Sequence, residues 1–181
     1  MSAASPPDGS RPERMHRLFF ALWPTDALRN SLAPRIRALQ PGDVGRLQRP
    51  DQWHLTLEFL GPVPGARLAQ ARAAADAVQA TPCEILLDTV EFWRRPEVLC
   101  LVARETPPAL ADLVAQLRCS LVKHGFQAES RPFRAHLTLA RKVQQPVAAM
   151  PFAPLRWPVE SFALVESVTD RSGSVYTPLA Q

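Results

Sequence analysis

The sequence predicts an α+β fold made of two similar lobes. A nine-residue pattern, R-P-x-x-x-H-L-T-L, occurs twice, from Arg49 to Leu57 and from Arg131 to Leu139. In each half of the chain, segments with the periodicity of amphipathic helices are interleaved with segments that alternate like strands. Helices interleaved with antiparallel strands are typical of the α+β class, and the repeated pattern indicates that the lobes arose by duplication.

One domain is expected. Residues 1–14 are rich in Ser and Pro and contain no apolar run, so we expect a disordered tail there. Residues 15–181 can bury a core of their own without a partner, and we expect a monomer.

Composition narrows the class of protein further. Hydrophobic residues make up 46% of the chain, but no apolar run approaches the ~20 residues of a membrane span. Cys83, Cys100 and Cys119 lack metal or redox spacing, which suits a reducing cytoplasm, and we expect all three in the core. The net charge of +4 permits an anionic partner without requiring one.

The first half of the chain offers two strands and two helices. Residues 17–23 are apolar enough for a buried strand, and residues 53–60 alternate as a strand that stops at Gly61. One helix begins at Thr25, and another covers about 66–79. The apolar stripe of the first helix is Leu28, Leu32, Ile36 and Leu39, with Pro34 as a candidate kink.

The second half also combines strands with a long helix. Residues 85–92 and 98–103 are expected to form a hairpin. A helix then begins with Thr106 as N-cap and Pro107 as its first residue, and it ends at Gly125. Further strands are expected at 133–143, 162–168 and 175–179, separated by a loop through Pro146, Pro151 and Pro154 and by a turn at Ser172-Gly173.

The repeated strand separates polar from apolar residues. Because side chains alternate along a strand, His54 and Thr56 share one face while Leu55 and Leu57 occupy the other. The second copy places His136 and Thr138, with their leucines, in the same way. If a two-fold axis relates the lobes, the two His/Thr faces meet across a cleft.

Two such faces could catalyse in-line displacement at one phosphate. A neutral imidazole would take a proton from water while an imidazolium gives one to the leaving oxygen, and the threonine hydroxyls would bind the non-bridging oxygens. Histidine suits both tasks because its ordinary pKa is about 6.5. No metal or other cofactor is required. For one isolated H-x-T, ordinary structural hydrogen bonding would be the better interpretation; two copies in matching context favour catalysis.

With these paired motifs the chain resembles a known family, the two-histidine (2H) phosphoesterases, which carry paired H-x-T-x motifs. The similarity is greatest to bacterial RNA 2′,3′-cyclic phosphodiesterases of the LigT-like, 2′-5′ RNA ligase group. Supporting segments are Arg17–Leu22, His54–Gly61, Arg131–Arg141 and Tyr176–Leu179. The resemblance implies a bilobal fold with antiparallel sheets lining a central cleft, helices outside, and no metal.

The resemblance also implies roles that the symmetric motif leaves open. His54 is expected to donate a proton to the 3′ oxygen, and His136 to activate water as a base. Thr56 and Thr138 are expected to hold the phosphate. Arg141 is expected near it too, although plain alternation would turn this residue to the opposite face, so a twist or bulge must intervene.

Other candidates around the motifs leave alternatives open. Four aromatic residues could stack on a base or pack in the core: Phe20, Trp53, Phe133 and Tyr176. Five basic residues flank the motif strands and could guide RNA phosphates: Arg46, Arg49, Arg131, Arg134 and Lys142. Arg49 and Arg131 could instead anchor the loops that enter each strand. His16 and His124 are expected to lie outside the site.

The sequence therefore predicts a metal-independent hydrolase. The expected reaction opens RNA 2′,3′-cyclic phosphate ends, on single-stranded or tRNA-like RNA, to 2′-phosphomonoesters. A 2′-5′ RNA ligase reaction would be the reverse of opening a 2′-5′ linkage through the cyclic phosphate, and we expect hydrolysis to dominate because water is abundant and the cyclic phosphate is strained. The alternatives are a module that binds RNA ends without turning them over and a 2H enzyme for small cyclic nucleotides.

Overall fold

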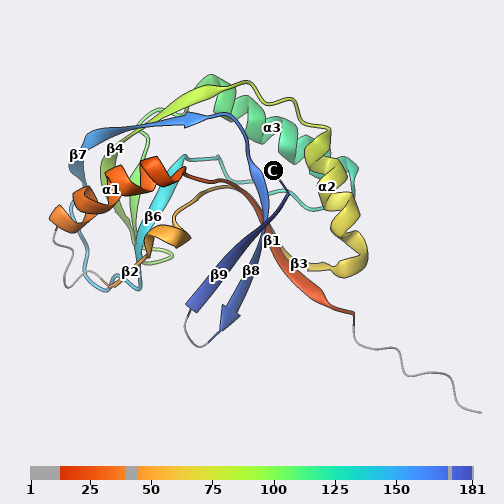
Figure 1. Cartoon of the computed structure of the whole chain (residues 1–181), viewed down its shortest axis with the longest axis horizontal. Coiled ribbons are helices and arrows are strands. Elements are labelled where there is room, and N and C mark those ends of the chain that lie inside the picture. The colour runs from red at the N-terminus through yellow and green to blue at the C-terminus, as the bar shows by residue number, and fades with distance from the viewer. Residues whose placement is uncertain (1–12, 40–44, 171–172, 181) are drawn as a thin grey trace, which may run out of the picture.

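Two antiparallel sheets and three α-helices form the described part of the chain (Figure 1). The computed structural model describes residues 13–39, 45–170 and 173–180. Most of the expected tail, residues 1–12, and Ser172 of the expected turn lie outside this part of the chain. Among the described helices, none is both long and apolar enough to span a membrane.

The two sheets hold one copy of the repeated strand each. The first sheet has the order β3-β1-β8-β9, and the second has the order β2-β6-β5-β4-β7. The strands of the first sheet are β1 (Met15–Leu22), β3 (Leu55–Pro64), β8 (Ala163–Asp170) and β9 (Gly173–Ala180). Those of the second are β2 (Arg46–Leu47), β4 (Cys83–Trp93), β5 (Val98–Val102), β6 (His136–Arg141) and β7 (Met150–Val159). The predicted α+β fold of two sheet-based lobes is confirmed.

Two of the α-helices each contact the sheet that does not contain the strand before them. The α-helices are α1 (Asp26–Ala38), α2 (Leu68–Asp76) and α3 (Pro108–Lys123); single 3₁₀ turns are η1 (Pro50–Gln52) and η2 (Gly65–Arg67). Helix α1 follows β1, yet its Arg35 lies over the Phe152 ring of β7 in the second sheet. Helix α3 follows β5, yet its Arg118 pairs with Glu58 on β3 of the first sheet. Figure 1 shows α1 beside the second sheet and α2 with α3 on the opposite side.

Alternation along the strands divides each sheet into a core face and a cleft face. On β1, Leu18 and Phe20 enter the main core, whereas Phe19 and Ala21 pack in a separate small cluster with β8. On β5 the main core receives Leu99 and Leu101, and a third cluster holds Val98, Cys100 and Val102. This separation leaves one face of each sheet available to line a site.

Several expected boundaries were wrong for physical reasons. Strand β3 continues through Gly61 because this glycine adopts a φ of 72°, which few other residues tolerate. Pro146 lies outside the strands as expected, but Pro151 and Pro154 of the expected loop lie in β7, and proline is compatible with that strand because it lies at a sheet edge. Pro107, not Thr106, is the N-cap of α3, and Pro34 lies within a continuous α1.

Candidate active site

The two repeated strands approach each other and line one cleft. Strand β3 forms an edge of the first sheet, and it contacts β6 of the second. The cleft between them has a volume of about 560 Å³. Its lining includes both motif pairs and the expected arginine: His54, Thr56, His136, Thr138 and Arg141. The structure therefore brings together the five residues that the repeated pattern and the family resemblance singled out.

A β-bulge recurs at the same place in both strands. Between β1 and β3, Phe20 pairs with Glu58 and Ala21 with Thr56, which leaves Leu57 as an extra residue. Between β5 and β6, Leu99 pairs with Ala140 and Cys100 with Thr138, which leaves Leu139 extra. One extra residue reverses the alternation beyond it, so Arg141 returns to the face of Thr138. The bulge that the sequence required is confirmed, at the second leucine of H-L-T-L.

Both histidines are held in the same tautomer by the backbone. The Nδ1–H of His54 donates to the carbonyl of Gln52 over 2.7 Å, and that of His136 donates to the carbonyl of Arg134 over 2.8 Å. A carbonyl can only accept, which fixes the proton on Nδ1 and leaves Nε2 of each neutral ring as a base. The spacing of two residues is the same in both lobes.

An aromatic cage surrounds His54. Trp23 stacks on its ring with planes 7° apart, while Phe19 and Tyr176 pack at centroid distances of 4.9 and 4.8 Å. Burial lowers the pKa of His54 to about 4, even though the hydrogen bond to Gln52 favours the charged ring. The nearby positive charge of Arg141 lowers this pKa further. At this pKa the His54 ring is neutral at physiological pH.

His136 has a smaller and more polar neighbourhood. The Trp93 ring lies 4.5 Å from its ring centre, and Arg134 extends over Trp93 and donates to Glu91 over 2.6 Å. Burial lowers the pKa of His136, the hydrogen bond to the Arg134 carbonyl opposes that shift, and the charges of Arg134 and Arg141 add to it. Burial would raise the pKa of Glu91, but hydrogen bonds from Arg134 and Trp93 outweigh it and the pKa is lowered.

An anion is the ligand that these groups can hold. Thr56 and Thr138 supply hydroxyls from opposite sheets, and Arg141 supplies a guanidinium without an acidic partner among the described residues. A guanidinium matches phosphate geometry through paired N–H donors. In the described part of the chain, no three His, Cys, Asp or Glu side chains are grouped as in a metal site.

Comparison with known proteins shows which family this chain belongs to. The family model described as "2′-5′ RNA ligase superfamily" matches residues 24–171. The chain belongs to this superfamily. An RNA 2′,3′-cyclic phosphodiesterase of Escherichia coli is 31% identical over 90% of this chain and 93% of its own length. A homologue of the same name from Thermus thermophilus is 31% identical over 90% of this chain and 87% of its own.

Solved structures of the superfamily have the same fold. The crystal structure of E. coli LigT complexed with 3′-AMP matches with a TM-score of 0.84 at 30% identity, over 92% of this chain and 96% of that one. LigT in its apo form matches with a TM-score of 0.83 at 30% identity, over 91% and 95%. The resemblance inferred from the paired motifs is thus confirmed.

Only some of the expected aromatic residues reach the cleft between β3 and β6. Phe133 lines it, and Tyr176 contacts His54. The assignment of Phe20 to substrate binding is corrected, because its side chain is fully buried on the core face of β1. Trp53 is likewise in the core. Four aromatic residues that sequence reasoning missed lie at the site: Phe19, Trp23, Phe59 and Trp93.

The repeated Arg-Pro pairs participate in the loops that enter the motif strands. Arg49 bonds Asp51 through both Nε and Nη2, and Arg131 pairs with Glu129. The main-chain carbonyl of Arg131 also accepts from Arg118 of α3. These contacts favour the loop-anchoring interpretation for both arginines.

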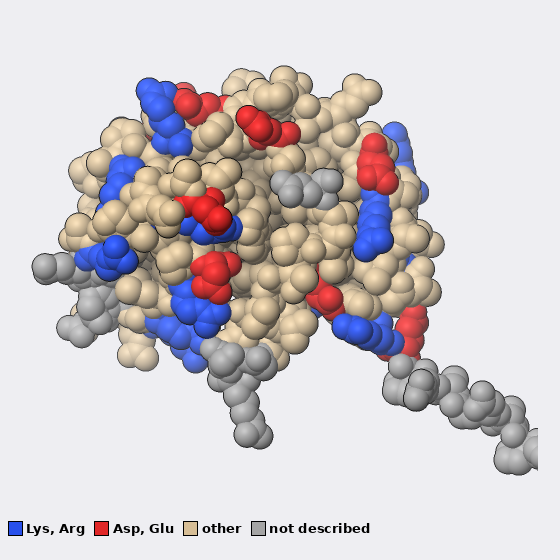
Figure 2. Space-filling model, in the orientation of Figure 1, with Lys and Arg blue, Asp and Glu red and all other residues tan. Residues whose placement is uncertain are grey.

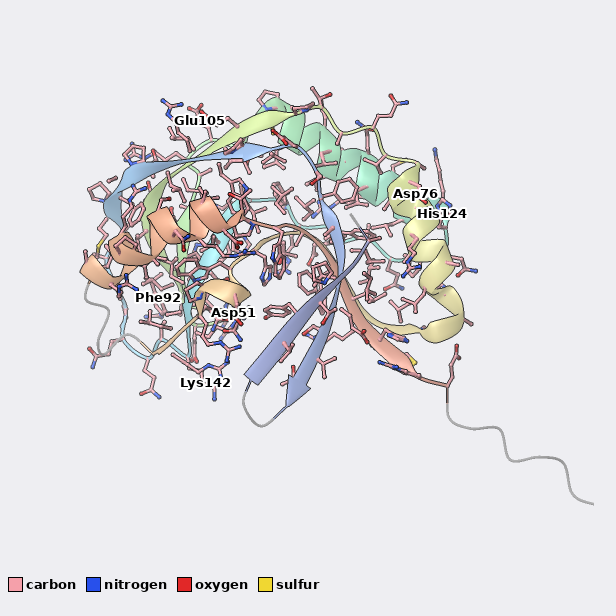
Figure 3. The ribbon with its side chains drawn as sticks, in the orientation of Figure 1. Asp51, Asp76, Phe92, Glu105, His124 and Lys142 are labelled. Atoms are coloured by element: carbon pink, nitrogen blue, oxygen red, sulfur yellow. The ribbon has the colours of Figure 1, made fainter. Side chains whose placement is uncertain are left out.

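The remaining histidines and cysteines have other environments. His16 pairs with Glu166 over 2.7 Å, and His124 bonds the Ser120 carbonyl at the end of α3, which Figure 3 shows far from β6. Cys100 is buried and Cys83 half-buried, but Cys119 is exposed on α3, so the expectation of three core cysteines was wrong for Cys119.

Proposed function

We propose that the protein hydrolyses RNA 2′,3′-cyclic phosphate ends to 2′-phosphomonoesters by acid–base catalysis between two histidines. The observation that supports this most strongly is the matched pair of Nδ1–H bonds to main-chain carbonyls at His54 and His136. Both bonds leave Nε2 available, in one cleft that also holds two threonines and Arg141. The homologues named RNA 2′,3′-cyclic phosphodiesterase supply the substrate class.

The reaction then needs one proton taken and one given. His136 removes a proton from water as its oxygen attacks phosphorus, and the bond from phosphorus to the 3′ oxygen breaks. His54 as imidazolium protonates that 3′ oxygen, so the phosphate remains on the 2′ oxygen. Thr56, Thr138 and Arg141 bind the non-bridging oxygens, whose negative charge is stabilised in the transition state. In a 2′-5′ ligation a 5′-hydroxyl would replace water, so His136 would take its proton and His54 would again protonate the 3′ oxygen; the opening of a 2′-5′ linkage would exchange these roles.

The substrate itself has to load the proton on His54. The pKa of this residue is about 4, because the ring is buried. A cyclic phosphate brings one negative charge, which favours an imidazolium beside it and raises the pKa. The protonated acid is therefore formed with the bound substrate, not before it.

Changing the leaving atom tests the two roles separately. In a substrate whose 3′ oxygen is replaced by sulfur, the leaving thiolate needs little protonation, since thiols have a pKa near 8.5. We expect this substrate to restore turnover to His54→Ala but not to His136→Ala, with wild type as the reference. Restoration in His136→Ala alone would reverse the roles, and phosphorus NMR showing a 3′-phosphate product from the natural substrate would contradict the mechanism.

The partner and the assembly state belong to the same proposal. The substrate end is expected to be single-stranded RNA, and the enzyme is expected to act as a monomer because the described chain forms a complete cleft from its own two sheets. Size-exclusion chromatography with light scattering, at the concentration used for the activity measurement, tests the monomer.

A further inference from the structure

The cations around the cleft divide into two groups. At one end, each arginine has an acidic partner: Arg118 with Glu58, Arg131 with Glu129, and Arg134 with Glu91. The second group, here called the basic end, comprises Arg46, Arg94, Arg95, Arg141 and Lys142. Within the described ranges, none of these five forms an ion pair.

The basic end is one surface although three chain segments contribute to it. Arg46 of β2 lies in register with Arg141 of β6, which in turn is in register with Val98 of β5. The N–H of Val143 donates over 3.0 Å to the carbonyl of Glu97, which brings Lys142 beside the β4–β5 turn. Arg94 and Arg95 are exposed in that turn.

This arrangement costs folding free energy unless an anion occupies it. Like charges directly opposite each other in a sheet are destabilising, and Arg46 faces Arg141 across the β2–β6 pair. Among residues 46–47, 94–97 and 141–142, which supply these cations, Glu97 is the one acidic residue, and none of the described ion pairs includes it. Charge left unneutralised beside a cleft attracts anionic ligands and is typical of surfaces that bind phosphate chains.

The basic end is also continuous with the phosphate site. Arg95 and Arg141 line the cleft itself. The guanidinium of Arg46 extends towards the β8–β9 turn, because Nη1 lies 3.5 Å from where a Cβ on Gly173 would be. Figure 2 shows Lys and Arg side chains gathered at the lower left, where Figure 1 draws the ends of β2 and β6, and Figure 3 places Lys142 there.

We propose that the RNA chain preceding the terminal phosphate leaves the cleft along the basic end and not past the ion-paired end. This inference rests on the proposed function and specifies its substrate as a polynucleotide rather than a mononucleotide. Successive backbone phosphates contact Arg94, Arg46 and Lys142 in addition to the terminal phosphate at Arg141. The contacts are sequence-independent, because they involve phosphate and not base edges.

Two substrates of different length test this path of the RNA chain along the basic end, here called the track. The variant combines Arg46→Ala with Lys142→Ala, and the substrates are a tetraribonucleotide with a cyclic end and a mononucleoside 2′,3′-cyclic phosphate. We expect KM for the tetranucleotide to rise about 2- to 30-fold at 0.1 M salt, as for loss of two exposed charge contacts. The slope of log KM against log salt should fall by about 1.4, at 0.7 for each single-strand phosphate contact. Turnover of the mononucleotide should stay unchanged.

A charge-matched control excludes a general effect of net charge. Arg104 and Arg156 are exposed and pair with Asp88 and Glu84 of β4, away from the cleft lining. The double variant Arg104→Ala with Arg156→Ala removes the same two charges, and we expect both substrates to be unaffected. An equal rise in KM for this control, or an unchanged tetranucleotide KM in the first variant, would overturn the track.

A binding measurement separates the track from the proposed chemistry. If wild type turned over neither substrate, the proposed function would fail, and fluorescence anisotropy with a labelled tetraribonucleotide would still decide the track. Weaker binding in the Arg46/Lys142 variant than in the control would support it. Equal binding of all three proteins would refute it.

Discussion

Phe59 and Arg141 occupy equivalent positions in the two copies of the repeated strand. Each lies three residues after the motif threonine, and each lines the cleft because the intervening leucine forms a bulge. The repeated strand thus provides two matching positions, of which only one holds a cation. The cleft is symmetric in its histidines and threonines but asymmetric in charge.

Replacing Arg141 tests that asymmetry. Arg141→Ala should lower kcat about 10²- to 10³-fold, as for loss of one preorganised donor to a developing oxyanion. It should also raise the pKa of both histidines in the free protein, because this positive charge lowers them. Activity assays and imidazole NMR titrations measure the two effects, and Arg156→Ala is the control for charge. Unchanged histidine pKa values would show that Arg141 does not act on the pair.

The pH dependence should differ between free and substrate-bound protein. Burial lowers the pKa of both histidines, to about 4 for His54, and catalysis needs one ring charged and one neutral. The bell-shaped profile of kcat/KM, which reports the free enzyme, should therefore have its maximum below about pH 6.5, the ordinary pKa of histidine. The profile of kcat should shift to higher pH, because bound phosphate raises both values. Coincident profiles would argue against loading of the acid by substrate.

Glu58 should be essential for stability. Its side chain is fully buried, and it accepts bonds from Arg118 Nε over 2.8 Å and from the N–H of Glu129 over 2.5 Å. Glu58→Ala leaves Arg118 without its partner, and we expect a loss of about 3–5 kcal/mol in the free energy of unfolding. Glu58→Leu combined with Arg118→Leu should recover part of it. Urea denaturation that gives the double variant no advantage over the single one would contradict this account.

Gln52 should control the burial of His54 from a distance. Its amide donates to the Ser174 carbonyl of β9 over 2.7 Å, and β9 carries Tyr176 against the His54 ring. Gln52→Glu removes this donor but keeps the main-chain carbonyl that holds Nδ1. We expect faster amide exchange in β9 and a pKa of His54 raised from about 4 towards its ordinary value, because burial is the main cause of the shift.

A matched variant loosens β9 at its other end. Arg72 donates to the carbonyl of Leu179, so Arg72→Ala should speed exchange there without changing the pKa of His54. Equal effects of the two variants on that pKa would mean that Gln52 has no specific connection to the site.

Local patterns predicted the centre of the site, and distant partners determined the rest. The alternation of H-L-T-L placed its histidines, threonines and leucines on the correct faces, because that rule needs only neighbouring residues. Trp93 could not be found this way, since β4 reaches His136 only through the pairing of the second sheet. The sequence also predicted Phe20 at the site where the structure has Phe19. A shift of one residue along a strand exchanges the core face for the cleft face, and local alternation did not determine which of the two faces the cleft.

Strand pairing also determined the elements that the sequence concealed. Strand β7 carries several prolines, which indicate a loop by local rules, and its pairing with β4 at the sheet edge makes it a strand. Strand β2 is only two residues long and exists through its bonds to β6. It nevertheless supplies Arg46 to the basic end.

In the proposed mechanism two histidines act on one phosphate without a metal. The most direct measurement is single-turnover hydrolysis of RNA with a 2′,3′-cyclic end in EDTA, by wild type, His54→Ala and His136→Ala. We predict full activity of wild type and a loss of about 10²- to 10⁴-fold in each variant, the usual contribution of a general acid or base. A loss below about 10²-fold in either variant, or inactivation of wild type by EDTA, would contradict the mechanism.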